Sequence, residues 1–377
     1  MRESHINRGG DRMIIKMPKL RLDILSDYRA ACYGFCAIWI VLFHAVVNLG
    51  CDFSCGIQGL SFLNTAFSFG SFGVDIFMLL SGVSCYFSWS KKCDAGAFLR
   101  KRLIRIVPSV LLICVPVWTF FVLVGEMHWT RLLYNATLVL PIFSDGSSGV
   151  WYVAAILMLY AAYPYIHAVI YGTGDRKDEF HLLLRVFVLC ILTLFGFWML
   201  HKYNAPLFKN LEIMVGRIPT FCIGSYLGHL VKERRAFGLS AWCCMALASI
   251  SYIAYVLLAF KLVQSNCWWW RVTMIPGGIL GAFLICGMFC LLDRLRFVRP
   301  VSALISLTGS FSLELYVAHV AFFWFRNLCP SIIGNVTIAL ILSCLSWFIA
   351  YLVNRVLHVW FGGGIVALIG KRKESAR

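Results

Sequence analysis

The sequence predicts an all-α polytopic membrane protein with about ten transmembrane helices and with both termini in the cytoplasm. Of its 377 residues, 60% are hydrophobic and 14% are charged, whereas a soluble protein of this length carries more charge and shorter apolar runs. Apolar stretches recur from end to end, each about 20 residues long and able to cross a hydrocarbon core of ~30 Å as a helix. Basic residues are concentrated in alternate connecting loops, as in a chain that crosses a membrane repeatedly.

The apolar stretches divide the chain into three regions. We expect residues 1–29 to form a basic cytoplasmic leader, residues 30–360 one membrane domain, and residues 361–377 a basic cytoplasmic tail. Within the domain, the predicted spans cover residues 30–50, 70–89, 104–125, 149–171, 182–201, 212–231, 239–260, 271–292, 302–325 and 333–357.

The distribution of basic residues predicts the orientation. Most of the 34 Lys and Arg residues lie in the leader, the even-numbered loops and the tail. Basic residues are retained on the cytoplasmic side, so we expect a multi-pass protein of the cell membrane. The net charge of +17 then reflects topology, and nucleic-acid binding is not expected. The odd-numbered loops, predicted to lie outside, hold Arg131, Lys202, Lys209, Lys261, Arg271 and Arg326.

Four ionisable residues of different spans are predicted to lie at one depth, near the outer surface. With a rise of 1.5 Å per residue, His44 lies ~9 Å and Asp75 ~8 Å below that surface, and Arg217 and His319 lie at similar depths. Isolated charges in lipid cost about 3 kcal/mol or more each, so a shared hydrated cavity that opens outward is favoured. The alternative is that each group is a structural one, bonded to a neighbouring helix.

The cytoplasmic side carries a possible anion site in the stretch "FLRKRLIRIVPSVL". Arg102 and Arg105 are three residues apart, so on a helix they share a face and could grip a phosphate together. The alternative is an anchor for anionic lipid headgroups. No cluster of Cys and His has the spacing of metal ligands, and no metal is expected.

Six motifs, in order, resemble those of the acyltransferase-3 family of membrane acyltransferases. The matching stretches are "IVLFHAVV", "FGVDIFMLLSG", "FLRKRLIRIVP", "WYVAAILMLYAAYP", "GRIPTFCIGSYLG" and "GSFSLELYVAH". Two departures are visible. Tyr33 and Gly34 stand where family members often have an Arg-Gly pair, with Arg29 nearby, and Glu314 and Tyr316 lie in a ninth-span motif of unusual sequence.

The resemblance implies an O-acetyltransferase type of enzyme. It would move an acyl group, commonly acetyl, from cytoplasmic acetyl-CoA or another acyl-CoA to a hydroxyl of a cell-surface or lipid-linked saccharide. By the resemblance, His44 matches the catalytic histidine of the first span and Asp75 belongs to the G-V-D motif. Arg102 and Arg105 match the R-x-x-R motif, which is associated with acyl-CoA.

The residue types suit this chemistry. A neutral His44 could take the proton of the attacking hydroxyl and return it to the thiolate in a direct transfer. The alternative is an acyl-histidine intermediate. Asp75 could orient the imidazole, as the acid of a catalytic triad does.

Further residues near the same level are candidates for contacts with the oxyanion or the acceptor. Arg217 or His319 could stabilise the oxyanion, and Glu314 is a further candidate. Trp151 and Tyr152 could stack on a sugar, or they could belong to the interfacial aromatic belt.

A function of another class remains open at this point: a transporter or flippase for a lipid-linked glycan, since a helix bundle with a polar midsection suits it as well.

Overall fold

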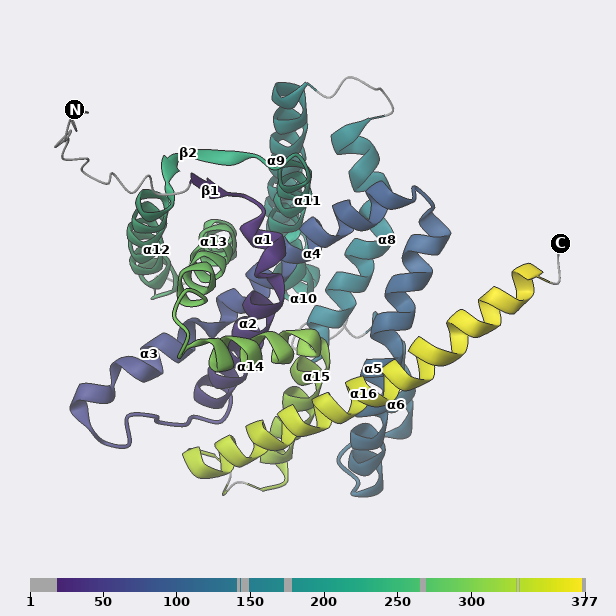
Figure 1. Ribbon diagram of the computed structural model, residues 1–377. Helices are drawn as coiled ribbons and strands as arrows, with labels where there is room; N and C mark the ends of the chain where they lie inside the picture. The colour runs from purple at the N-terminus through teal and green to yellow at the C-terminus, as the bar shows by residue number, and fades with distance from the viewer. Residues whose placement is uncertain are drawn as a thin grey trace, which may run out of the picture.

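The computed structural model describes residues 19–140, 143, 149–172, 178–264, 269–329, 331 and 333–374. It is a bundle of helices (Figure 1), which confirms the predicted all-α class. Two short strands that the sequence did not predict, β1 (Lys19–Arg21) and β2 (Ala236–Ser240), pair antiparallel beside the bundle. Residues 1–18 and 375–377 lie outside the described residues, so the predicted boundaries of leader, domain and tail remain predictions.

Each predicted span overlaps at least one helix. In the first half of the chain the helices are α1 (Ile24–Asp27), α2 (Arg29–Val47), η1 (Gln58–Leu60), α3 (Phe62–Ser68), η2 (Phe69–Ser71), α4 (Phe72–Lys91), α5 (Ala95–Leu123), α6 (Trp129–Ala136) and α8 (Trp151–Tyr171). In the second half they are α9 (Glu179–Tyr203), α10 (Ala205–Val215), α11 (Ile218–Lys232), α12 (Ala241–Gln264), η3 (Trp270–Thr273), α13 (Met274–Leu292), α14 (Arg299–Ser310), α15 (Ser312–Phe323), η4 (Trp324–Asn327) and α16 (Val336–Glu374).

Fewer than ten of the described helices are by themselves long and apolar enough to cross a membrane. Among the described residues, seven helices are long and apolar enough, or eight if α14 and α15, which are bent by 76° at their junction, form one span. The sixth predicted span is divided between α10 and α11 at Gly216 and Arg217, just before Pro219. In α12 the apolar helix covers Ala246–Leu258. The count of ten and the cytoplasmic position of the termini therefore stay predictions.

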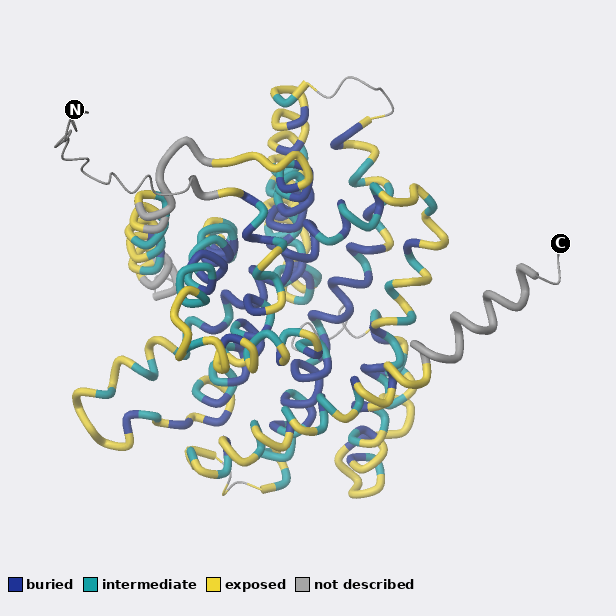
Figure 2. The backbone as a smooth tube through the Cα atoms, viewed as in Figure 1, coloured by how far each residue is buried: buried dark blue, intermediate teal, exposed yellow. Residues whose placement is uncertain are grey.

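Helix α4 lies at the centre of the bundle, where Figure 2 shows a concentration of buried residues. Its residues from Phe72 to Val83 are all buried, and it packs against α2, α8, α11 and α13. By contrast, α9 and α16 expose apolar side chains such as Leu192 and Phe348, as expected where a helix faces lipid rather than water. The polar groups described below are attached to the central helices.

Helices α2 and α14 cross with their backbones in contact. A Cβ atom on Gly34 would lie 1.8 Å from the carbonyl oxygen of Ile305, and one on Gly309 would lie 1.8 Å from that of Ala30. Small residues allow such close approach between helices in membranes. This crossing fixes α2 relative to α14 and thereby to α15, which follows directly.

The crossing predicts that Gly34→Ala destabilises the protein by about 1–3 kcal/mol, the usual cost of overpacking, because the obstacle is backbone and cannot rotate away. Thermal unfolding of the purified protein in detergent measures the effect. The matched control is Gly196→Ala in α9, where an added Cβ meets nothing within 4 Å and the helix gains propensity. Equal stability of the two variants would contradict the assigned role of Gly34.

Candidate active site

The imidazoles of His44 and His319 form a pair between α2 and α15. Nδ1 of His44 lies 2.8 Å from Nε2 of His319, and the two rings stack with centroids 5.0 Å apart. Nδ1 of His319 lies 2.9 Å from the backbone carbonyl oxygen of Leu315. His319 is fully buried, whereas His44 is partly exposed.

These contacts assign the protons of the two neutral rings. A carbonyl oxygen can only accept a hydrogen bond, so Nδ1 of His319 carries the hydrogen. Nε2 of the neutral His319 then has a lone pair and accepts from Nδ1–H of His44. The remaining nitrogen of His44, Nε2, is therefore unprotonated and basic. The pair thus holds His44 in the tautomer that a general base needs.

Asp75 and Arg217 form a second pair, between α4 and α11. Nε of Arg217 lies 3.0 Å from Oδ1 of Asp75, and Nη2 donates to Oδ2 at 3.2 Å. Both side chains are buried, and Nη1 of Arg217 also donates to the carbonyl oxygen of Ile213 at 2.8 Å. A buried carboxylate is stable only beside a compensating charge, which the guanidinium supplies and a neutral imidazole does not. Where the sequence suggested that Asp75 orients His44, the structure instead gives two separate pairs, with His319 next to His44.

One cavity connects the two pairs. We call it the histidine cavity; its volume is about 540 Å³, within the range of small-molecule sites. Trp151 lines it and lies under the guanidinium of Arg217, 5.2 Å from ring centroid to Cζ. Tyr152, in contrast, points into the protein, where it packs against Phe77. Residues that line the cavity include Ile40, Phe43, His44, Asn64, Thr65, Ser68, Phe69, Phe72, Trp151, Arg217, Arg271 and Tyr316.

Helix α3 contributes a polar wall to the histidine cavity, made of Asn64, Thr65 and Ser68. The sequence did not predict these residues at the site, because their stretch reads as an external loop. Asn64 of this wall donates to Asp52 at 2.5 Å and accepts from the backbone N–H of Phe53 at 2.9 Å. Hydrogen bonds from Ser54 and Asn64 hold the pKa of the Asp52 carboxyl below its ordinary value. The loop before α3 is thus attached to the rim of the cavity.

Arg271 was counted as an external loop residue, yet it also lines the histidine cavity. Its Nε donates to Oε1 of Glu212 at 3.0 Å, which ties η3 to α10. The cavity therefore presents two guanidinium groups, each already paired with a carboxylate.

Among the described residues, no group of three or more His, Cys, Asp or Glu side chains is arranged to hold a metal ion.

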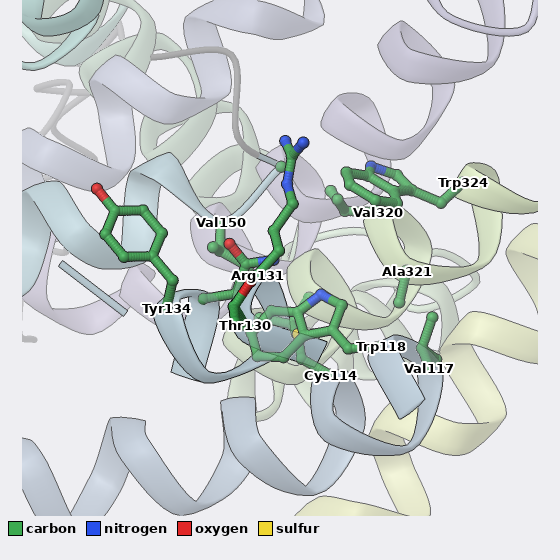
Figure 3. Close-up of a pocket in the computed structure, with 13 residues that line it drawn as sticks. Cys114, Val117, Trp118, Thr130, Arg131, Tyr134, Val150, Val320, Ala321 and Trp324 are labelled. Atoms are coloured by element: carbon green, nitrogen blue, oxygen red, sulfur yellow. The ribbon is translucent and has the colours of Figure 1, made fainter. Parts of the chain in front are cut away.

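A neighbouring cavity of about 610 Å³ contains none of the predicted site residues. Figure 3 shows its lining, with Arg131 of α6 between Tyr134 and Trp324, and Trp118 below. The hydroxyl of Tyr316 donates to the carbonyl oxygen of Gly149 at 3.0 Å. Tyr316 lines the histidine cavity and Gly149 lines the neighbouring cavity, so this contact is part of the wall between the two.

The structure separates the two arginines of the R-x-x-R motif. Arg105 pairs through both terminal nitrogens with the carboxylate of Glu314 on α15, and Ser109 donates to the same carboxylate at 2.8 Å. Glu314 has no exposed surface, so it requires this charge. Its contact with the oxyanion or the acceptor stays a prediction. The guanidinium of Arg102, one turn earlier, lies over the rings of Phe98 and Tyr160 instead.

Arg102 belongs to a basic cavity of about 660 Å³. Nη2 of Arg102 donates to the carbonyl oxygen of Ser84 at 3.3 Å, and Nη1 of Arg29 donates to the hydroxyl of the same serine at 3.1 Å. Five of the lining residues are basic, and none of those described is acidic; the basic ones are Arg29, Lys91, Lys92, Lys101 and Arg102. Arg105 is outside this lining.

The basic cavity and the histidine cavity lie at opposite ends of the same helices. On α2, Arg29 and His44 are separated by ~22 Å of helix, at 1.5 Å per residue. Between the cavities runs a column of aromatic rings with successive centroids 5.2, 5.9 and 5.3 Å apart. From the basic cavity onward its members are Tyr33, Phe77, Tyr152 and Tyr316.

Comparison with known families identifies the chain. A family model described as an acyltransferase domain, that of the acyltransferase-3 family, matches residues 34–355. The protein therefore belongs to this family and is a membrane acyltransferase. Comparisons with curated proteins and with solved structures gave no match.

The buried Glu314 network predicts that Arg105→Gln lowers the stability of the protein by about 3 kcal/mol, because it leaves a buried carboxylate without its counter-charge. Thermal unfolding of the purified variant in detergent measures the loss. Adding Glu314→Gln to the Arg105→Gln chain removes the orphaned charge, and the double variant should be more stable than the Arg105→Gln single variant. A double variant whose losses simply add would show that the two side chains do not interact energetically.

Proposed function

We propose that this acyltransferase moves an acyl group, acetyl by the family resemblance, from acyl-CoA to a hydroxyl of a cell-surface or lipid-linked saccharide. The observation that carries the proposal is the His44–His319 pair, of which His44 lines a cavity that combines apolar side chains with a few polar groups. The pair supplies a positioned base, and the cavity supplies room for an acceptor.

His44 acts as the general base. Its Nε2 takes the proton of the acceptor hydroxyl while the hydroxyl oxygen attacks the thioester carbonyl. The C–S bond then breaks, and the same proton passes to the thiolate, so coenzyme A leaves as a thiol. His319 is a positioning residue that fixes the tautomer of His44. In the alternative route through an acyl-histidine, the same Nε2 lone pair attacks the thioester carbonyl as a nucleophile and the thiolate leaves; the acceptor hydroxyl then takes the acyl group from Nε2, and its proton passes to the thiolate.

The guanidinium groups of Arg217 and Arg271 face the space where the oxyanion forms. Each is held in place by a carboxylate, Asp75 or Glu212, so neither has to reorganise when charge develops on the carbonyl oxygen. The role of Asp75 in this proposal is to hold Arg217. The amide and hydroxyl groups of α3, together with Trp151, line the place of the acceptor.

The acyl-CoA donor enters at the basic cavity, which the charge distribution predicts to face the cytoplasm. Its basic side chains match the phosphates of coenzyme A in charge. The acyl-bearing arm then has to extend along the aromatic column to reach His44. Since Phe77, Tyr152 and Tyr316 are closely packed, the rings must shift to admit the arm.

One observation fits the alternative of a transporter for lipid-linked glycans. The 76° break between α14 and α15 is of the kind found at the binding sites of transporters. The two functions are distinguished by incubating the purified protein with labelled acetyl-CoA. An enzyme transfers or hydrolyses the acetyl group, and a transporter leaves it on coenzyme A.

The base assignment predicts that His44→Ala lowers kcat by about 10²–10⁴-fold, the usual contribution of a general base, while the thermal unfolding of the protein changes little. Acetyl transfer or hydrolysis per mole of folded protein is the measurement. His44→Ala protein with near-normal turnover would exclude His44 as the base.

The positioning role of His319 predicts a graded effect. His319→Gln keeps a carbonyl oxygen that can accept from Nδ1–H of His44, whereas His319→Ala does not. We expect kcat to fall further in the alanine variant than in the glutamine variant, with the KM for acetyl-CoA nearly unchanged in both. Equal losses of kcat in the two variants would argue for a merely structural role.

The donor site predicts that Arg102→Gln raises the apparent KM for acetyl-CoA by about tenfold or more, because a charge-assisted phosphate contact is lost. The apparent KM for the acceptor should change much less, and Arg102→Lys should restore the donor contact only in part. Arg100→Gln is the matched control, since this exposed residue of α5 carries the same charge outside the cavity lining. Identical acetyl-CoA saturation curves for the Arg102→Gln and Arg100→Gln variants would show that acyl-CoA does not bind in this cavity.

A further inference from the structure

Tyr316 of α15 stands at the junction between the aromatic column and the histidine cavity. Its ring is the last of the four in the column, 5.3 Å from that of Tyr152. The same ring meets that of His319 at 5.6 Å and 75°, and it is the member of the column that lines the histidine cavity. Because Tyr316 is only 3% exposed, a donor arm that follows the column has to displace its ring before the thioester reaches His44.

A hydrogen bond to a segment outside α15 holds this ring in place. The hydroxyl of Tyr316 donates to the carbonyl oxygen of Gly149 at 3.0 Å, across 167 residues of sequence. Gly149 lies two residues before α8 begins at Trp151, so the bond joins α15 to the entry of α8. We call the bond between Tyr316 and Gly149 the latch. A neutral hydrogen bond costs far less to break than a buried ion pair, so the latch can open while the charged framework stays in place.

The carbonyl oxygen that accepts the latch is fixed by close packing. A Cβ atom on Gly149 would lie 2.3 Å from Cγ1 of Val320, and Val320 follows Tyr316 by one helical turn on the same face of α15. The backbone before α8 therefore lies directly against α15 and has little freedom to move. The phenol ring, in contrast, can turn about its side-chain bonds, so the ring is the moving part of the latch.

A displaced ring has space beyond the latch. The neighbouring cavity of about 610 Å³ is lined by Gly149 and Val320, and also by Val317, which follows Tyr316 in sequence. Figure 3 shows Val150 and Val320 at this wall. The ring can therefore leave the end of the column without any separation of the packed helices.

We propose that Tyr316 is a positioning residue that gates the donor route. With the latch closed, its ring blocks the column, and with the latch open, the acyl-bearing arm of the donor passes to His44. The proposal rests on the proposed function and names a residue that controls access of the donor to the same site. Because donor binding includes the opening of the latch, the apparent affinity for the donor is reduced to the fraction of molecules in which the latch is open.

The gate predicts that a weaker latch improves donor binding. Tyr316→Phe keeps the ring and removes the hydroxyl, so the open fraction should rise about fivefold, which corresponds to one hydrogen bond of about 1 kcal/mol. The probe is S-acetonyl-coenzyme A, a thioether that has the arm of acetyl-CoA but a C–S bond that the reaction does not cleave. Calorimetric titration of the full-length protein in detergent should show about fivefold tighter binding of this thioether by the Tyr316→Phe variant than by the unchanged protein.

One ligand and one variant serve as matched controls. Adenosine 3′-phosphate 5′-diphosphate carries the phosphates of coenzyme A without the arm, so both proteins should bind it equally. Tyr163→Phe also removes a buried hydroxyl with a contact of 3.0 Å, in this case to Ser225. Tyr163 belongs neither to the aromatic column nor to the lining of the basic cavity or the histidine cavity, so the Tyr163→Phe variant should bind the thioether as the unchanged protein does.

Unchanged or weaker binding of the thioether by folded Tyr316→Phe protein would overturn the gate. The same tightening in the Tyr163→Phe variant, or for the nucleotide without the arm, would overturn it as well, because the effect would then not arise at the end of the column. Absence of thioether binding by all three proteins would refute the donor route and the gate together.

Turnover of labelled acetyl-CoA distinguishes a gate from a catalytic or a merely structural hydroxyl. The value of kcat/KM for acetyl-CoA compares the free protein, in which the latch is closed, with the transition state, in which it is open. It should therefore rise about fivefold in the Tyr316→Phe variant. A fall in kcat/KM would show that the hydroxyl stabilises the transition state, and an unchanged value would leave it a structural role; both results would contradict the gate.

The two measurements also separate this inference from the proposed function. Tighter thioether binding by the Tyr316→Phe variant, without turnover of acetyl-CoA by any of the proteins, would refute the proposed reaction and leave the gate in place. Turnover that depends on His44, together with equal thioether binding by the Tyr316→Phe variant and the unchanged protein, would refute the gate and leave the acyltransferase reaction in place.

Discussion

The ion pair between Asp75 and Arg217 joins the most buried helix of the bundle, α4, to α11 at a place where neither side chain reaches bulk solvent. Such a pair tolerates little displacement, because a buried charge that loses its partner costs several kcal/mol. The same condition applies to Glu314, which draws Arg105 of α5 onto α15. Paired charges thus constrain how α4, α5, α11 and α15 are placed around the candidate site.

The histidine pair depends on this framework in a different way, because its rings need no counter-charge when neutral. What it needs is that α2 and α15 lie close enough for a direct contact between two imidazole rings. The glycine crossing of α2 with α14 and the 76° bend into α15 provide this closeness. A carbonyl oxygen on α15 then determines the tautomers of both rings.

In the proposed reaction, the acyl-CoA donor reaches His44 from the basic cavity, along a packed column of aromatic rings. These rings lie between the basic cavity and the histidine cavity. Helix α3 contributes Asn64, Thr65 and Ser68 to the histidine cavity, while Ala66 and Phe67 of the same helix line a separate apolar groove.

The sequence by itself determined the class of protein and the family. Apolar stretches of membrane-spanning length have few alternatives to helix in a bilayer, and costly groups such as His44, Asp75, Arg217 and His319 stand out against them. Helical rise places His44 and Arg217 at one level, and both line one cavity.

Only the tertiary structure decided the partners of these groups. Residue depth places four groups at one level but does not give their azimuth around the bundle, so Asp75 was expected beside His44 and is paired with Arg217 instead. The same holds for Arg102 and Arg105, which are one turn apart and yet contact different elements. The polar wall of α3 and the position of Arg271 depend on segments that the sequence presents as loops. Pairing of this kind is decided by which helices pack together, and that depends on the whole set of side chains rather than on any local pattern.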